Sequence, residues 1–292
     1  MTGTHTRVAT GLDLYNRAAA DAAATVIARY STSFGLACRM LGPRPRPHVR
    51  NIYALARIAD EIVDGPAAEA GLTPGATAAL LDQLEQETHD AIDRGFSSNL
   101  VVHAFATTAR ECGIGADLVV PFFASMRTDL QTQRHDAASH DAYVYGSAEV
   151  IGLMCLQVFV NAGSGHPVAP APELIDGARR LGAAFQDVNF LRDLAHDRGV
   201  LGRDYLDVSS AGERARVLAR IDADLAAAAR VIPELPADSR RAVTAAHDLF
   251  AELAARLRDG DGSEERVRVP DAVKARLAAR ALMGFGPREV RA

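Results

Sequence analysis

The chain has 292 residues, of which 48% are hydrophobic and 24% charged, and its formal net charge is -5. This length is enough to bury a sizeable core, and the composition is that of a globular protein. A basic excess is missing, so nucleic acid is not expected as a partner. The cysteines, Cys38, Cys112 and Cys155, lie far apart and predict neither a disulfide framework nor a structural zinc site. The longest apolar run, 150–160, is too short to span a bilayer, so we expect a cytoplasmic protein with at most peripheral membrane contact.

Helical periodicity runs through most of the chain. Between Leu12 and Tyr30, for example, apolar residues recur at spacings close to three and four. The same pattern predicts helices, in chain order, over 12–30, 49–63, 77–93, 99–112, 117–134, 140–162, 173–198, 211–231, 238–258 and 270–283. Proline and glycine clusters separate these stretches, and alternating β-branched runs are absent. The sequence therefore predicts an all-α fold, with residues 1–292 in a single domain.

Three carboxylates gather near the end of the predicted helix 49–63. Asp60 and Asp64 are four residues apart and share one helix face, and Glu61 lies three residues before Asp64. Like charges at this spacing destabilise a helix slightly, so they are either solvated or balanced by a cation. Acidic pairs on solvated faces are common, and this pattern alone favours no function. Four basic residues beside it are expected in a solvated loop: Arg44, Arg46, His48 and Arg50.

A second polar stripe lies in the predicted helix 173–198. Asn189, Asp193 and Asp197 follow one another at intervals of four and line one face, and Gln186 joins them. Such a stripe is unfavourable in an apolar helix unless its groups are paired or coordinate a metal. Two acidic faces far apart in sequence suggest a facing pair, and oxygen ligands of this kind suit Mg²⁺, with Mn²⁺ as an alternative. Because Mg²⁺ keeps coordination positions open for phosphates, the implied substrate is a phosphate or diphosphate.

Two residue patterns enclose these side chains. The first is Arg57-x-x-Asp60-Glu61-x-x-Asp64. The second is Gln186-x-x-Asn189-x-x-Arg192-Asp193-x-x-x-Asp197, followed by Gly202-Arg203-x-Tyr205-Leu206. Together they resemble the two aspartate-rich motifs of the squalene and phytoene synthases. Three further segments are similar to sequence elements of that family: Tyr30–Phe34, Tyr143–Gly152 and Val267–Pro270. The resemblance covers roughly residues 20–285.

The resemblance implies the isoprenoid synthase fold, an all-α bundle of helices around a central cavity. The implied metal ligands are Asp60, Glu61, Asp64, Asn189, Asp193 and Asp197. The implied catalytic residues are Asp60, Asp64, Asp193, Asp197, Tyr145 and Arg203. The implied substrate-binding residues are Ser31, Ser33, Phe34, Tyr53, Arg57, Gln186, Asn189, Arg192 and Tyr205. Phe34 is expected to line the cavity, where an aromatic face stabilises a cation.

The family's chemistry implies a magnesium-dependent prenyltransferase that acts on allylic prenyl diphosphates. The leading interpretation is head-to-head coupling of two geranylgeranyl diphosphates to phytoene, for which no nicotinamide cofactor is expected. Besides Glu61, which stands where the family often has aspartate and keeps the charge, three residues depart from the family pattern: Glu149, His196 and Phe250. They suit an alternative in which one short prenyl group moves to an aromatic small-molecule acceptor in secondary metabolism, with Glu149 as a base. A third interpretation, a non-catalytic scaffold or lipid carrier of the same fold, does not require the metal ligands.

Overall fold

The computed structural model describes residues 10–31, 33–131, 136–196, 205–206, 208, 210–259 and 267–289. Within these ranges the chain forms helices and no strands, which confirms the all-α prediction. The α-helices are α1 (Gly11–Tyr30), α2 (Ser33–Met40), α3 (Arg46–Val63), α4 (Pro66–Glu69), α5 (Pro74–Arg94), α6 (Leu100–Cys112), α7 (Ala116–Gln131), α8 (Ala137–Val144), α9 (Val150–Asn161), α10 (Pro172–His196), α11 (Ala211–Val231), α12 (Ala237–Asp259) and α13 (Asp271–Leu282).

The observed helices depart from the predicted ones in a few places. The short helices α2 and α4 have no counterpart among the predictions, because too few turns are present to show a period. Helix α3 begins at Arg46 rather than at residue 49, since Pro47 lies in the first turn, where a missing N–H costs nothing. The predicted ends at 132–134 and 197–198 lie outside the described residues. The single-domain expectation stays a prediction.

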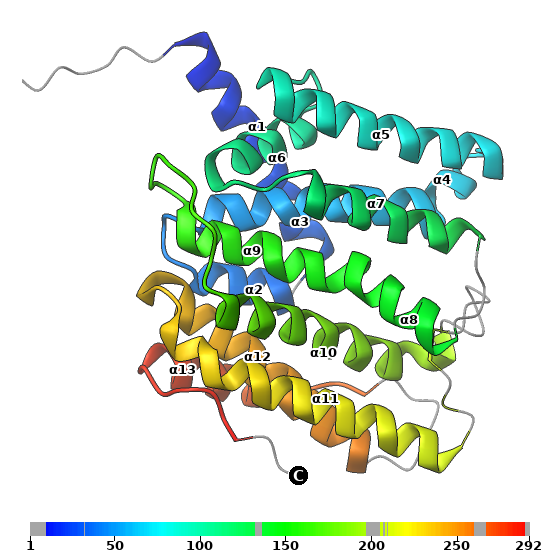
Figure 1. The fold of residues 1–292 in the computed structure, drawn as a ribbon, viewed down its shortest axis with the longest axis vertical. Helices are drawn as coiled ribbons and strands as arrows, with labels where there is room; N and C mark the ends of the chain where they lie inside the picture. The colour runs from blue at the N-terminus through cyan, green and yellow to red at the C-terminus, as the bar shows by residue number, and fades with distance from the viewer. Residues whose placement is uncertain are drawn as a thin grey trace, which may run out of the picture.

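The helices stack in successive layers (Figure 1). Helices α1, α5 and α6 lie together on one side, and α3, α7 and α9 form the next layer. Helix α10 packs between α9 and α11, and α12 contacts α2, α11 and α13. Segments far apart in sequence therefore meet in the middle of the bundle, where α3 from the first motif and α10 from the second both border the same interior.

One glycine pair allows α10 to approach the helix before it unusually closely. A Cβ built on Gly152 of α9 would lie 2.6 Å from the carbonyl oxygen of Ala178, and one on Gly182 would lie 2.6 Å from that of Ala148. Real side chains do not tolerate such distances, so both positions need glycine. Beside this contact, residues Tyr145–Glu149 form a π-helical turn that joins α8 to α9. Turns of this kind often occur at functional sites.

Local capping fixes several helix ends. Thr10 and Asp13 form a reciprocal capping box at the start of α1, and Ser210 and Glu213 do the same for α11. These side chains satisfy N–H groups that lack a partner within the helix. The capping residues follow directly from sequence, so the ends of these helices are locally determined.

By length and composition, one helix in the described part of the chain is able to cross a membrane: Ala138–Asn161. It comprises α8, the π turn and α9, and 44% of its most apolar window is buried. The helix packs against α7 and α10 within the bundle. Its apolar character is accounted for by this core position.

Candidate active site

A cavity of about 500 Å³ lies among α2, α3, α9, α10, α12 and α13. Apolar and aromatic side chains form most of its wall, including Phe34, Ile52, Leu181, Phe185, Leu249 and Phe250. Polar side chains from both motifs also line it: Asp60 from α3, and Gln186, Asn189 and Arg192 from α10. The cavity therefore combines a charged and polar portion with an apolar interior, which suits an amphiphilic ligand.

Helix α3 directs the first motif into this cavity. The Arg57 guanidinium pairs with Glu61 one turn on, and its Nη1 lies 3.7 Å from Asp60 Oδ2. Asp60 itself lines the cavity, whereas Asp64 is exposed and caps the end of the helix. The i, i+4 relation predicted for Asp60 and Asp64 is present, and of these two residues Asp60 lies on the cavity wall.

The carboxyl of Asp60 is held in an unfavourable environment for its charge. Its side chain is 37% exposed and contributes to the wall of the cavity. Loss of solvation there, followed by the nearby charge of Asp64, raises the pKa of Asp60 to about 7. Asp129 and Glu61 act in the same direction, and Arg57 opposes them. A bound cation would relieve this repulsion.

The Arg57 side chain also offers a donor to the site. Its guanidinium lies over the ring of Tyr30, 4.8 Å from the ring centre. The Nε atom is buried, and among the described residues it has no hydrogen-bond partner. A buried, unsatisfied donor on a cation is costly. It fits an anionic group held close to the first motif.

Helix α10 brings the second motif to the opposite wall. Gln186, Asn189 and Arg192 line the cavity. Arg192 donates from Nε to Oδ1 of Asp193 at 3.0 Å, which orients that carboxylate beside the cavity-lining residues. Asp197 and Arg203, and the side chain of His196, lie outside the described residues. Their predicted roles stay predictions.

The predicted serine and aromatic residues divide into those at the cavity and those away from it. Ser31, Phe34 and Tyr53 line it, with the rings of Phe34 and Tyr53 stacked at 5.3 Å. Burial raises the pKa of the Tyr53 hydroxyl, although a hydrogen bond with Ser31 opposes the shift. Nothing is described of the Ser33 side chain. The Arg179 guanidinium lies over the Tyr145 ring, 5.3 Å from the ring centre. Tyr145 is not among the residues that line the cavity.

For Asp129 of α7 the sequence leaves two possibilities open: a side chain that reaches the pocket, or an ordinary surface pair with Arg127. Asp129 accepts hydrogen bonds from the hydroxyls of Tyr143 at 2.8 Å and Tyr205 at 2.7 Å. Its charge also contributes to the raised pKa of Asp60, so it lies close to the first motif. Arg127 pairs with Asp82 and Glu85 of α5. Asp129 and Tyr205 are 76 positions apart in sequence, so no spacing along the chain predicts their contact.

The donor chemistry of the two motifs fits Mg²⁺. Asp60, Glu61, Asp64, Asn189 and Asp193 offer only oxygen atoms, the ligands that this ion prefers. Within the described ranges, no three His, Cys, Asp or Glu side chains form a group ready to hold a metal. Asp197, a predicted ligand, lies outside those ranges. The predicted metal set therefore stays a prediction, supported by the electrostatics around Asp60.

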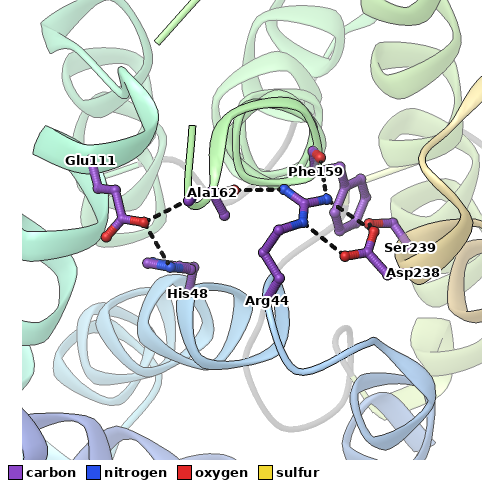
Figure 2. Close-up of polar contacts among 8 residues, drawn as sticks. Arg44, His48, Glu111, Phe159, Ala162, Asp238 and Ser239 are labelled. Atoms are coloured by element: carbon purple, nitrogen blue, oxygen red, sulfur yellow. Dashed lines mark hydrogen bonds and ion pairs between the residues drawn. The ribbon is translucent and has the colours of Figure 1, made fainter. Parts of the chain in front are cut away.

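A network centred on Arg44 joins the turn before α3 to the end of α9 and the start of α12 (Figure 2). Arg44 donates to the carbonyl oxygens of Phe159 and Ala162, each at 2.8 Å, and so caps the end of α9. Its Nε also donates to Asp238 at the start of α12, at 2.8 Å. Phe159 lines the cavity. Arg44 lies in the loop before α3, as predicted, but its guanidinium is only 32% exposed and bonds the end of α9 and the start of α12, so the expectation that it is simply solvated was wrong.

His48 belongs to the same region and is likewise internal. Its Nδ1 lies 3.0 Å from Thr108 Oγ1 of α6, and its Nε2 lies 3.5 Å from Glu111 (Figure 2). Burial lowers the pKa of this imidazole, while Glu111 opposes the change. The solvated-loop prediction was wrong for His48 too, because it lies on the inner side of α3.

The fold and the cavity define an isoprenoid synthase fold. A dehydrosqualene synthase crystal structure superposes with a TM-score of 0.75 at 20% identity, over 92% of this chain and 97% of that one. Squalene synthase HpnC from Alicyclobacillus acidocaldarius gives 0.72 at 18% identity, over 84% of this chain and 95% of that one. The chain belongs to the squalene/phytoene synthase family, whose model matches residues 27–272.

Curated relatives share modest identity with the chain. The chloroplastic phytoene synthase of Daucus carota is 32% identical over 187 residues, which is 64% of this chain and 45% of the carrot protein. The chain thus spans under half the length of that relative. The phytoene synthase of Mycobacterium tuberculosis is 27% identical over 275 residues, 86% of each protein.

Proposed function

We propose that the chain is a Mg²⁺-dependent prenyltransferase that acts on allylic prenyl diphosphates. Its most fitting reaction is the head-to-head coupling of two geranylgeranyl diphosphates to phytoene. One observation supports this above the others: Asp60 and the polar residues of α10 line the same cavity as a large apolar wall. A diphosphate head and a hydrocarbon tail need both kinds of surface in one site. The family and the named relatives point to the same chemistry.

The residues of this chain have distinct tasks in such a reaction. Asp60, Asn189 and Asp193 would hold Mg²⁺ together with the predicted ligands Glu61, Asp64 and Asp197. When bound, the metal supplies positive charge that stabilises a departing diphosphate. Arg192 lines the cavity, and Arg57, which lies beside the cavity-lining Asp60, adds fixed positive charge next to it.

The apolar wall would protect the carbocation that forms when the diphosphate leaves. Phe34, Phe185 and Phe250 line the cavity, and Phe185 stacks on Phe250 with 3.8 Å between ring centres. Aromatic faces attract positive charge, and apolar walls exclude water that would quench a carbocation. Phe250, one of the departures from the family pattern, thus contributes an aromatic face without a hydroxyl.

The transfer to an aromatic acceptor has less support. In that alternative Glu149 serves as a base toward the acceptor. Arg179 donates to Glu149 at 2.6 Å, and Glu149 is not among the residues that line the cavity. This placement agrees with a structural ion pair between the π turn and α10. The scaffold or lipid-carrier interpretation does not explain why a carboxylate, that of Asp60, lies on the cavity wall.

A product assay tests the proposal. The protein is incubated with Mg²⁺ and with dimethylallyl, geranyl, farnesyl or geranylgeranyl diphosphate in turn, and products are identified by mass. We expect a symmetric C40 hydrocarbon from geranylgeranyl diphosphate alone, and none when EDTA replaces the metal. Turnover that appears only after an aromatic compound is added would support the alternative acceptor. No consumption of any diphosphate would leave the scaffold interpretation.

A further inference from the structure

A buried histidine, His140 of α8, has no part in the reaction proposed above. It is 6% exposed and is not among the residues that line the cavity. Its Nδ1 lies 2.7 Å from the backbone carbonyl oxygen of Tyr205, and its Nε2 lies 3.0 Å from Oδ1 of Asp187 in α10. Because a carbonyl oxygen only accepts hydrogen bonds, Nδ1 carries a proton and donates to Tyr205. The imidazole therefore binds the segment that follows the second motif.

Two further residues orient the His140 ring. The side chain of Asp187 is 2% exposed, and its Oδ2 accepts from Arg220 of α11, at 2.9 Å from Nε and 2.8 Å from Nη2. Arg220 Nη2 also lies 3.1 Å from His140 Nε2. A carboxylate bound by a guanidinium in this way has a defined position. Oδ1 of Asp187 is thus held in place beside the imidazole, and the ring is oriented from both α10 and α11.

Tyr205, which His140 binds by its backbone, is held by its side chain as well. Its ring stacks on Phe190 of α10 with 4.4 Å between ring centres, and its hydroxyl donates to Oδ1 of Asp129 at 2.7 Å. Tyr143 donates to Oδ2 of the same carboxylate at 2.8 Å. His140 and Tyr143 are three residues apart on α8, so they lie on one side of that helix. Helix α8 therefore holds both Tyr205 and the carboxylate that Tyr205 binds.

Asp129 connects this arrangement to the first motif. Burial is the largest cause of the raised pKa of Asp60, and the charge of Asp129 adds to it, so the two carboxylates lie within electrostatic reach of each other. Helix α8 lies at one end of the bundle, beside the C-terminal ends of α7 and α10 (Figure 1). Asp60 lines the cavity. A displacement of Asp129 would therefore change the electric field at a predicted metal ligand.

We propose that His140 is a positioning residue for prenyl transfer. Its hydrogen bond to the Tyr205 backbone keeps the Tyr205 hydroxyl on Asp129, and so fixes the carboxylate that acts on Asp60. The inference rests on the proposed function and deepens it, because it names the residue that holds the second motif's end in register with the first motif. A histidine that only joined α8 to α10 would need its contact with Asp187 and not the one with Tyr205.

Two substitutions separate these two contacts. Asparagine carries its amide nitrogen near the position of Nδ1, and glutamine carries its own near that of Nε2. His140→Asn thus keeps a donor for Tyr205, whereas His140→Gln keeps a contact with Asp187. We expect His140→Gln to raise KM for geranylgeranyl diphosphate about 5-fold and to change kcat by less than about 2-fold. His140→Asn should stay within about 2-fold of the parent in both constants. If the histidine only joins the helices, glutamine is the milder substitution.

A double variant tests whether the effect passes through Tyr205. Once Tyr205→Phe has removed the hydroxyl, H140Q should change KM by less than about 2-fold further. His103 of α6 is the matched control: it is 1% exposed, its Nε2 lies 2.7 Å from Oδ1 of Asn16, and it is not among the cavity-lining residues. His103→Gln should lower the melting temperature and leave KM unchanged, and its effect should add to that of Tyr205→Phe.

Calorimetric binding of inorganic pyrophosphate in the presence of Mg²⁺ repeats the comparison without turnover. H140Q should bind about 5-fold more weakly than the parent, and H140N should bind as the parent does. This pattern in a parent that converts no prenyl diphosphate would uphold the positioning role and refute the proposed function. Equal losses in H140N and H140Q, of folding or of affinity, would overturn the positioning role. So would parent-like KM and pyrophosphate affinity in H140Q, while turnover by the parent would leave the proposed function intact.

Discussion

The guanidinium of Arg44 grips the carboxylate of Asp238 through two hydrogen bonds, 2.8 Å from Nε to Oδ2 and 2.9 Å from Nη2 to Oδ1. The two residues are 194 positions apart in sequence. Through them the turn before α3 is joined to the first turn of α12, while the same guanidinium caps α9. A two-pronged arginine–carboxylate contact of this kind is directional and stronger than a single hydrogen bond. This polar clasp thus ties three segments of the bundle together, and one of the carbonyls it binds belongs to the cavity-lining Phe159.

Arg44→Ala should destabilise the fold by about 2 kcal/mol, because two helix-end carbonyls and one carboxylate lose their donor. Thermal unfolding measures the loss. Arg94→Ala is the matched control: its partner Asp90 is on the same helix, and both side chains are about half exposed, so the change should be within about 0.5 kcal/mol. Equal effects of the two substitutions would show that the clasp contributes nothing special.

The clasp should also lose strength in acid. The hydrogen bond from Arg44 lowers the pKa of Asp238 below 3.8. A carboxyl whose pKa is depressed on folding stabilises the fold above its unfolded pKa, and this contribution disappears as the pH falls through the folded value. The difference in unfolding free energy between the parent and Asp238→Asn should therefore be constant from about pH 5 to about pH 8. It should shrink below about pH 4, where the Asp238 carboxylate begins to take up a proton. Urea unfolding at several pH values checks this.

Asp60→Asn should abolish prenyl transfer and yet leave a protein at least as stable as the parent. The folded pKa of about 7 exceeds the unfolded value of 3.8, so the folded state holds a proton that the unfolded state releases, and stability falls as the pH rises between these values. Asparagine removes that loss. In EDTA at pH 8 the variant should therefore melt at a higher temperature, while turnover with Mg²⁺ should fall by about 100-fold or more. A lower melting temperature, or retained activity, would contradict the assignment.

Tyr205→Phe should cost about 1 kcal/mol of stability, since it removes the hydrogen bond to Asp129. Because Tyr205 is a predicted substrate-binding residue, the substitution should also raise KM more than it lowers kcat. A double-mutant cycle with Asp129→Asn measures the coupling, which should be at least about 0.5 kcal/mol for residues in contact. Strict additivity of the two substitutions would mean that the bond contributes nothing in solution.

Gly152→Ala should destabilise the protein by about 1–3 kcal/mol, because the new methyl group would press on the backbone of α10. Gly75→Ala offers the comparison within a helix. It lies in α5 with open space around its Cβ position, and alanine is the better helix former there. That variant should be unchanged or slightly more stable in the same melting experiment.

Glu149→Gln separates the two acceptor interpretations. Because Glu149 pairs with Arg179 and is not among the residues lining the cavity, we expect coupling of prenyl diphosphates to change by less than about 10-fold. A loss of about 100-fold or more, confined to reactions with an aromatic acceptor, would indicate a general base and favour that chemistry. Product analysis by mass distinguishes the two outcomes.

The sequence by itself determined the longer helices and the two polar stretches, at 60–64 and 186–193. Period and composition suffice for this because α1, α3 and α10 each bury one face, and because the side chains of Asp60 and Asp64, or of Asn189 and Asp193, share a helix face through local geometry. The capping boxes at Thr10 and Ser210 are equally local. These features depend on neighbours within four residues along the chain.

The tertiary structure decided which of these side chains meet. Asp60 and Asn189 line one cavity only because α3 and α10 border it from different layers. Asp129 acts on Asp60 through its charge and binds the Tyr205 hydroxyl, and Arg44, from the loop before α3, binds Asp238. Contacts between residues this far apart depend on how whole helices pack, and no spacing along the chain encodes them. For the same reason, the position of α13 beside the cavity emerged only once the helices were placed in space.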